Sequence, residues 1–76
     1  MIEVTSHRGF TISVRTGEGQ LSVATIARES GQPIVLEGRT HQTIILDPVG
    51  SNEAAIHDAT IMIDRILRGW HRKTEA

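Results

Sequence analysis

The apolar residues near the end of the chain recur at the spacing of an α-helix. Over residues 53–70 they fall three or four positions apart, so they line one face of a helix: Ala55, Ile56, Ala59, Met62, Ile63, Ile66, Leu67 and Trp70. This pattern predicts an amphipathic helix over about residues 52–71, which must bury its apolar face against another layer. Either Ser51 or Asn52 is suited to cap its first turn. Residues 73–76 are expected to fray.

The residues ahead of this helix alternate between apolar and polar, as half-buried strands do. Phe10, Ile12 and Val14 form the clearest such run. Glycine-containing turns divide this part of the chain, so we expect strands over residues 10–15, 20–29, 34–37 and 40–47. The pattern does not decide whether residues 1–5 form a further strand, or whether residues 34–46 form one strand or two.

Two segments do not fit a simple alternation. In the strand over 20–29, Leu21 and Val23 share one face, whereas Ile26 falls on the other. A β-bulge near Ala24-Thr25 would return Ile26 to the core face, and burial of both faces is the alternative. Three aliphatic residues at 44–46 cannot all face one side, so Ile45 is expected to point away from the helix, either as a stray apolar residue or in a dimer interface.

These elements predict a single α+β domain over residues 1–76. Residues 1–47 are strand-rich and form an antiparallel β-meander of three to five strands, and the helix packs across one face to give two layers. The predicted core consists of Phe10, Ile12, Val14, Leu21, Val23, Ile34 or Val35, Leu36, Ile44, Leu46, Ile56, Ala59, Ile63, Ile66 and Trp70.

Composition narrows the class of protein further. The chain has 76 residues, with no cysteine, eight basic residues and nine acidic residues. No disulfide can therefore stabilise the fold, and no strong excess of charge indicates a charged partner. No apolar run approaches the length of a membrane span, and the N-terminus does not resemble a signal peptide. We therefore expect a cytoplasmic protein that does not bind membranes. A small core favours dimerisation, or another protein partner, through an open sheet edge.

No residue pattern typical of catalysis is present. The four histidines lie far apart in the sequence, so we expect no metal site, no cofactor and no enzymatic activity. Glu53 with His57, and Asp64 with Arg68, have the i, i+4 spacing of ordinary helix surface pairs. The leading expectation is a small interaction or accessory module, with Ile45 as the candidate residue for self-association.

The alternative is weak nucleic-acid binding through phosphate contacts. Basic residues gather near the end of the helix, at Arg65, Arg68, Arg72 and Lys73. Further arginines are scattered over the strands: Arg8, Arg15, Arg28 and Arg39. The two aromatic residues lie on apolar stripes and are assigned to the core, so base stacking on the sheet is not expected.

Several short runs resemble a group of small bacterial proteins of unknown function. Gly9-Phe10-Thr11-Ile12 opens a strand, and Asn52-Glu53-Ala54 opens a helix that continues with Ala59 and Ile63-Asp64. The resemblance implies an antiparallel sheet followed by one C-terminal helix. It implies no catalytic residue. Ile44-Ile45-Leu46 and Pro48 depart from the pattern, where an aromatic residue is more usual before the helix.

Overall fold

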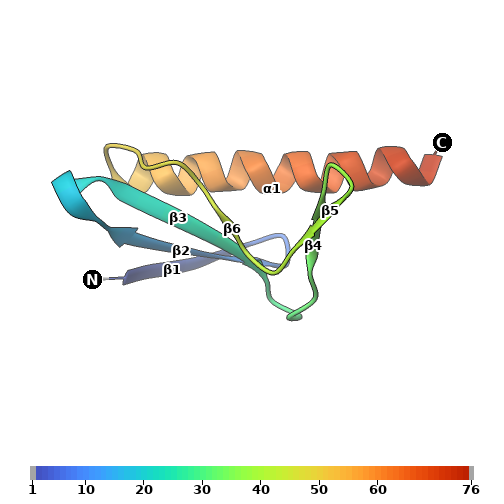
Figure 1. Ribbon diagram of the computed structural model, residues 1–76, viewed down its shortest axis with the longest axis horizontal. Helices are drawn as coiled ribbons and strands as arrows, with labels where there is room; N and C mark the ends of the chain where they lie inside the picture. Colours follow the sequence, from blue (N-terminus) through green and yellow to red (C-terminus); the bar gives the residue numbers. More distant parts are fainter. Residues whose placement is uncertain (1, 76) are drawn as a thin grey trace.

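The protein has two layers, a sheet of antiparallel strands and one long helix that lies along it (Figure 1). The computed structural model describes the backbone of residues 2–75 and the side chains of residues 2–17 and 19–68. The elements in chain order are β1 (Ile2–His7), β2 (Phe10–Thr16), the 3-10 turn η1 (Glu18–Gln20), β3 (Ser22–Arg28), β4 (Ile34–Leu36), β5 (Arg39–His41), β6 (Ile44–Ile45) and α1 (Asn52–Glu75). The predicted α+β class is confirmed.

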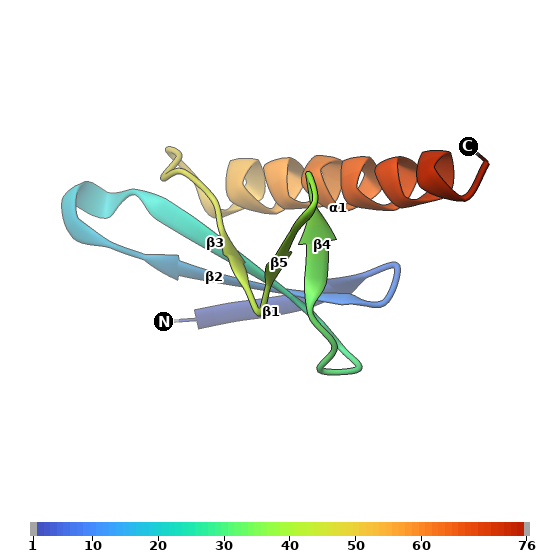
Figure 2. The ribbon, with the colours of Figure 1, turned by 45° about the vertical axis from the view of Figure 1, so that its right-hand side comes forward.

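The main sheet has the strand order β1-β2-β3-β6, with every neighbouring pair antiparallel. Between β3 and β6 the chain leaves this sheet and forms a separate hairpin, β4 with β5 (Figure 2). Residues 34–46 therefore form three short strands in two sheets. Residues 2–7 do form a strand, which settles the question that the sequence pattern left open.

Tight two-residue turns set the register of the β1–β2 and β4–β5 hairpins. Arg8 and Gly9, between β1 and β2, have φ angles of 51° and 85°, and Glu37 and Gly38, between β4 and β5, have φ angles of 53° and 78°. Two consecutive left-handed residues make a turn whose twist matches that of the flanking strands. The Arg8–Gly9 turn pairs His7 with Phe10, and this pairing determines which face every residue of β1 occupies.

The core lies between α1 and one face of β2 and β3, with Ile34 of β4 closing one end. Two of the predicted core residues are wrong: Leu21 is exposed and Val23 lies on the opposite face. Ser22, Ala24 and Ile26 point inward instead, and β2 and β3 pair without a bulge. The buried residues are Phe10, Ile12, Val14, Ser22, Ala24, Ile26, Ile34, Ala55, Ala59, Ile63 and Ile66.

The parity of β3 follows from packing. Ile26 is fully buried between the two layers, whereas the small side chain of Ala24 lets α1 approach the sheet. The alternative parity would place Leu21 and Val23 inside but would leave Ile26 in water. Around this centre, four further residues that the sequence places in the core are only partly buried against it: Leu36, Ile44, Leu46 and Ile56.

Ser51 caps α1, because its hydroxyl accepts a hydrogen bond from the Ala54 N–H at 3.1 Å. The helix then runs through Gly69 to Glu75, beyond the predicted end at about residue 71. The backbone of residues 73–75, where fraying is predicted, is helical. The side chain of Trp70 lies outside the described residues, so its predicted place in the core stays a prediction.

Candidate interaction surface

The face of the main sheet that α1 does not cover is the candidate functional surface, and we call it the open face. Residues paired across antiparallel strands share a face, and alternate residues along one strand lie on opposite faces. Val4, Ser13, Thr25 and Ile45 therefore form one row across all four strands. The open face comprises Ile2, Val4, Ser6, Thr11, Ser13, Arg15, Val23, Thr25, Ala27 and Ile45.

Strand β1 turns its apolar residues to the opposite face of the sheet from those of β2. Its apolar residues, Ile2 and Val4, lie on the open face and are 66% and 62% exposed. Its polar residues Glu3, Thr5 and His7 lie on the side of the helix. Since the Arg8–Gly9 turn sets the register, β1 cannot turn its apolar side inward without losing that turn.

The predicted orientation of Ile45 is confirmed, because it points away from the core and is 67% exposed. The structure brings it onto the same face as Val4 and half-buried Val23. Sequence reasoning missed Ile2, Val4 and Val23 as members of this surface. The signal that could have revealed them is the two-residue turn at Arg8–Gly9, from which the facing of β1 can be counted back.

Polar contacts attach β1 to the helix. Asn52 Nδ2 donates a hydrogen bond to Glu3 Oε1 at 3.2 Å, and the Ser22 hydroxyl donates to Asn52 Oδ1. At the other end of the strand, His7 Nε2 lies 3.0 Å from Asp64 Oδ1. These contacts hold β1 against α1 although β1 contributes no apolar residue to the core.

Asp64 has a different partner from the one that its spacing predicts. Its Oδ1 accepts hydrogen bonds from His7 and from the Arg8 guanidinium, both at 3.0 Å, so its ion pair crosses to the β1–β2 turn and does not run along the helix to Arg68. The hydrogen bond from His7, followed by that from Arg8, holds the pKa of Asp64 below its ordinary value.

The basic residues proposed for nucleic-acid contact are only partly placed. Arg65 and Arg68 are exposed on α1, and the side chains of residues 72 and 73 lie outside the described residues. Of the scattered arginines, Arg8 is paired with Asp64. Arg28 lies over the ring of Phe10, with its guanidinium carbon 5.8 Å from the ring centre. On the open face, Arg15 is the one charged residue.

Neither a metal-binding cluster nor a membrane-spanning helix is found in the part of the chain that the structure describes. Among those residues, no three or more His, Cys, Asp or Glu side chains gather where they could hold a metal ion. Glu53 and His57 are both exposed on α1. None of the helical segments described has the length and apolar character needed to cross a membrane.

No family model, curated protein or solved structure matches this chain. The resemblance to small bacterial proteins of unknown function therefore stays a prediction, and the surface has to be interpreted from its own residues.

Proposed function

We propose that this chain is a non-enzymatic interaction module that associates with a second copy of itself through the open face. The observation that carries the proposal is the inverted polarity of β1. A strand normally turns its apolar residues toward the core, whereas β1 turns Ile2 and Val4 outward and keeps polar residues on the helix side. Such a strand gains burial only when another molecule covers the open face.

The energetic gain is concentrated in a few side chains. Ile2, Val4 and Ile45 are each about two-thirds exposed, and full burial of a large aliphatic side chain is worth about 1.5–3 kcal/mol. Association costs translational and rotational freedom, which offsets part of this gain. A dimer of modest affinity, dependent on protein concentration, is the expected consequence.

The charge of the open face favours a copy of the same chain as the partner. In a two-fold dimer the same patch meets itself, so a strongly charged face would repel its own copy. Arg15 is the single charged residue among those of the open face. No aromatic residue lies on that face, which removes the stacking platform that RNA-binding sheets use.

Sedimentation velocity over a wide range of protein concentrations tests the proposal. We expect the sedimentation coefficient to rise with concentration for the unmodified protein, and to stay at the monomer value for Val4→Lys. Val35→Lys is the matched control, since Val35 is 48% exposed but lies in the separate β4–β5 hairpin. A strict monomer at high concentration, or equal association of the two variants, would overturn the proposal.

A further inference from the structure

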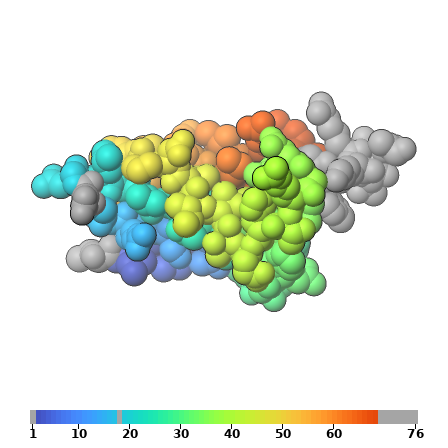
Figure 3. Space-filling model, in the orientation of Figure 1, coloured from blue at the N-terminus to red at the C-terminus, as the bar shows by residue number. Residues whose placement is uncertain are grey.

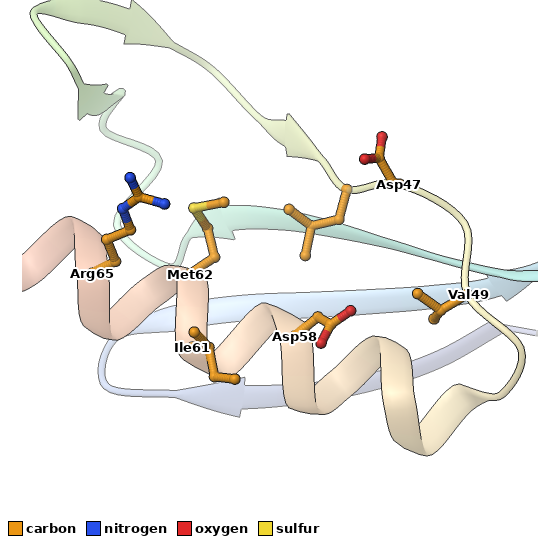
Figure 4. A pocket seen from close by; sticks show the side chains of 7 residues that line it. Asp47, Val49, Asp58, Ile61, Met62 and Arg65 are labelled. Carbon is orange, nitrogen blue, oxygen red and sulfur yellow. The ribbon is translucent and has the colours of Figure 1, made fainter.

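A groove of about 270 Å³ lies between α1 and the chain segment that follows β6 (Figure 4). Leu46 and Val49 come from this segment, and Ile61 and Met62 come from the helix. Ile61 is 53% exposed, so the groove is bordered by apolar surface that stays in contact with water. This site is separate from the open face, because Leu46 and Ile45 project to opposite sides of the chain.

The walls of the groove are fixed by the fold. The Leu46 N–H donates to the Ala24 carbonyl at 2.9 Å, and the Val49 N–H donates to the Ser22 carbonyl at 2.9 Å. These bonds hold the segment against β3. The opposite wall, α1, is anchored by its fully buried residues Ala59 and Ile63. The groove is therefore preformed, and little ordering is needed before an occupant binds.

The strand that leads into one wall, β6, has an unpaired edge. In the described residues β6 pairs with β3 alone and ends the main sheet. Because the Leu46 N–H points toward β3, the N–H and C=O of Ile45 point the other way, toward the free edge. Figure 3 shows this side of the molecule, with the yellow segment after β6 beside the orange helix.

The charged residues are sorted along the groove. Arg65 lies at one end beside Met62, whereas Asp58 on α1 and Asp47 on the opposite wall lie nearer the end that Val49 borders (Figure 4). Acidic side chains beside apolar surface attract a group that is both cationic and partly apolar. Lysine and arginine side chains have this character.

We propose that this groove binds an extended basic segment of another protein. The segment adds to the free edge of β6 at Ile45, places an apolar side chain against Leu46 and Met62, and directs a Lys or Arg side chain toward Asp47 and Asp58. Backbone pairing supplies affinity in this type of recognition, and the side-chain contacts supply specificity.

Fluorescence anisotropy with blocked synthetic hexapeptides tests this site. The first peptide has serine at every second position and valine and lysine at the positions between, so that valine and lysine lie on the same face of an extended strand. The second peptide replaces each lysine by glutamate. We expect the lysine peptide to bind more tightly than the glutamate peptide, and to lose about tenfold in affinity with Asp58→Lys. Glu29→Lys is the matched control, because it makes the same change of charge at an exposed carboxylate outside the groove. It is expected to leave peptide affinity unchanged.

Three further measurements test whether the peptide binds in this groove. Asp58→Asn, a smaller change, should also weaken binding if Asp58→Lys fails to fold. A lysine peptide with N-methylated backbone nitrogens should bind much more weakly, because it cannot pair with β6. Val4→Lys should leave peptide binding intact, because Val4 lies on the open face. Equal binding of the lysine and glutamate peptides, unchanged affinity in the Asp58 variants, tight binding of the methylated peptide or loss of binding in Val4→Lys would overturn the proposal.

Discussion

His7 and Asp64 are 57 positions apart in the sequence, and their side chains meet at 3.0 Å where β1 passes beneath α1. Arg8 reaches the same carboxylate oxygen. Together with the contact between Glu3 and Asn52, this ion pair attaches an edge strand that has no apolar residue facing the helix. On its helix side, β1 is thus held by polar and charged contacts, whereas Ile2 and Val4 on the open face remain exposed.

Acid should weaken this attachment. The pKa of Asp64 is held below its ordinary value by His7 and Arg8, so its contribution to folding is complete above the unfolded value of about 3.9 and is lost as the pH falls through the lower folded value. Asp64→Asn has no carboxylate to protonate. Thermal melting between about pH 6 and pH 2 should therefore show a smaller acid-induced loss of Tm for Asp64→Asn than for the unmodified protein. Parallel curves would contradict the role of this ion pair.

Truncation of Ile63 should be strongly destabilising. Ile63 is fully buried between the two layers, and removing a buried isoleucine side chain to Ala typically costs about 2–5 kcal/mol. Ile61 is 53% exposed two positions away, so Ile61→Ala serves as a matched control, with an expected change of about 0.5 kcal/mol. Urea unfolding followed by circular dichroism measures both, and similar midpoints for the two variants would count against the observed helix orientation.

A larger side chain at Ala24 should strain the contact between the layers. Ala24 is 1% exposed and faces α1, whereas Ala27 lies on the open face of the same strand. Ala24→Leu is expected to lose about 1–3 kcal/mol through overpacking, and Ala27→Leu should be tolerated in dilute solution. Thermal unfolding of the two variants distinguishes them. If Ala27→Leu were the more destabilising substitution, the result would favour the opposite facing of β3, with Leu21 and Val23 toward the core.

The turn between β1 and β2 should be sensitive to any residue at position 9 other than glycine. Gly9 has a φ of 85°, and a Cβ there would meet no atom within 4 Å, so the penalty of Gly9→Ala comes from the backbone alone and amounts to about 1–2 kcal/mol. Gly50 also has open space around it but no positive φ. Gly50→Ala should therefore show no such loss in urea unfolding, and equal effects of the two substitutions would contradict the left-handed turn.

Local sequence patterns were sufficient to predict the elements whose regularly spaced apolar residues are buried in the core. Phe10, Ile12 and Val14 alternate, and Ala59, Ile63 and Ile66 recur at helical spacing, so a strand and a helix with buried faces follow from the residues themselves. The exposure of Ile45 followed from the same reasoning, because three consecutive aliphatic residues cannot share one face of a strand.

Local sequence patterns could not predict which face of β3 is buried or which residues pair with Asp64. Leu21 and Val23 have the same alternation as Ala24 and Ile26, and only the packing of α1 selects the second pair. Asp64 has the correct spacing to Arg68, yet the strand brought beneath the helix supplies His7 and Arg8 instead. The groove beside Met62 arises from segments that are distant in the sequence.

The sequence by itself determined the C-terminal helix and the strands near residues 10–15 and 20–29, because apolar periodicity and turn chemistry act over a few neighbouring residues. It did not determine the strand at residues 2–7 or the division of the predicted strand over 40–47 between two sheets. Tertiary structure alone decided which strand faces were buried, and with them the open face, since burial depends on long-range packing and on the register imposed by the Arg8–Gly9 turn.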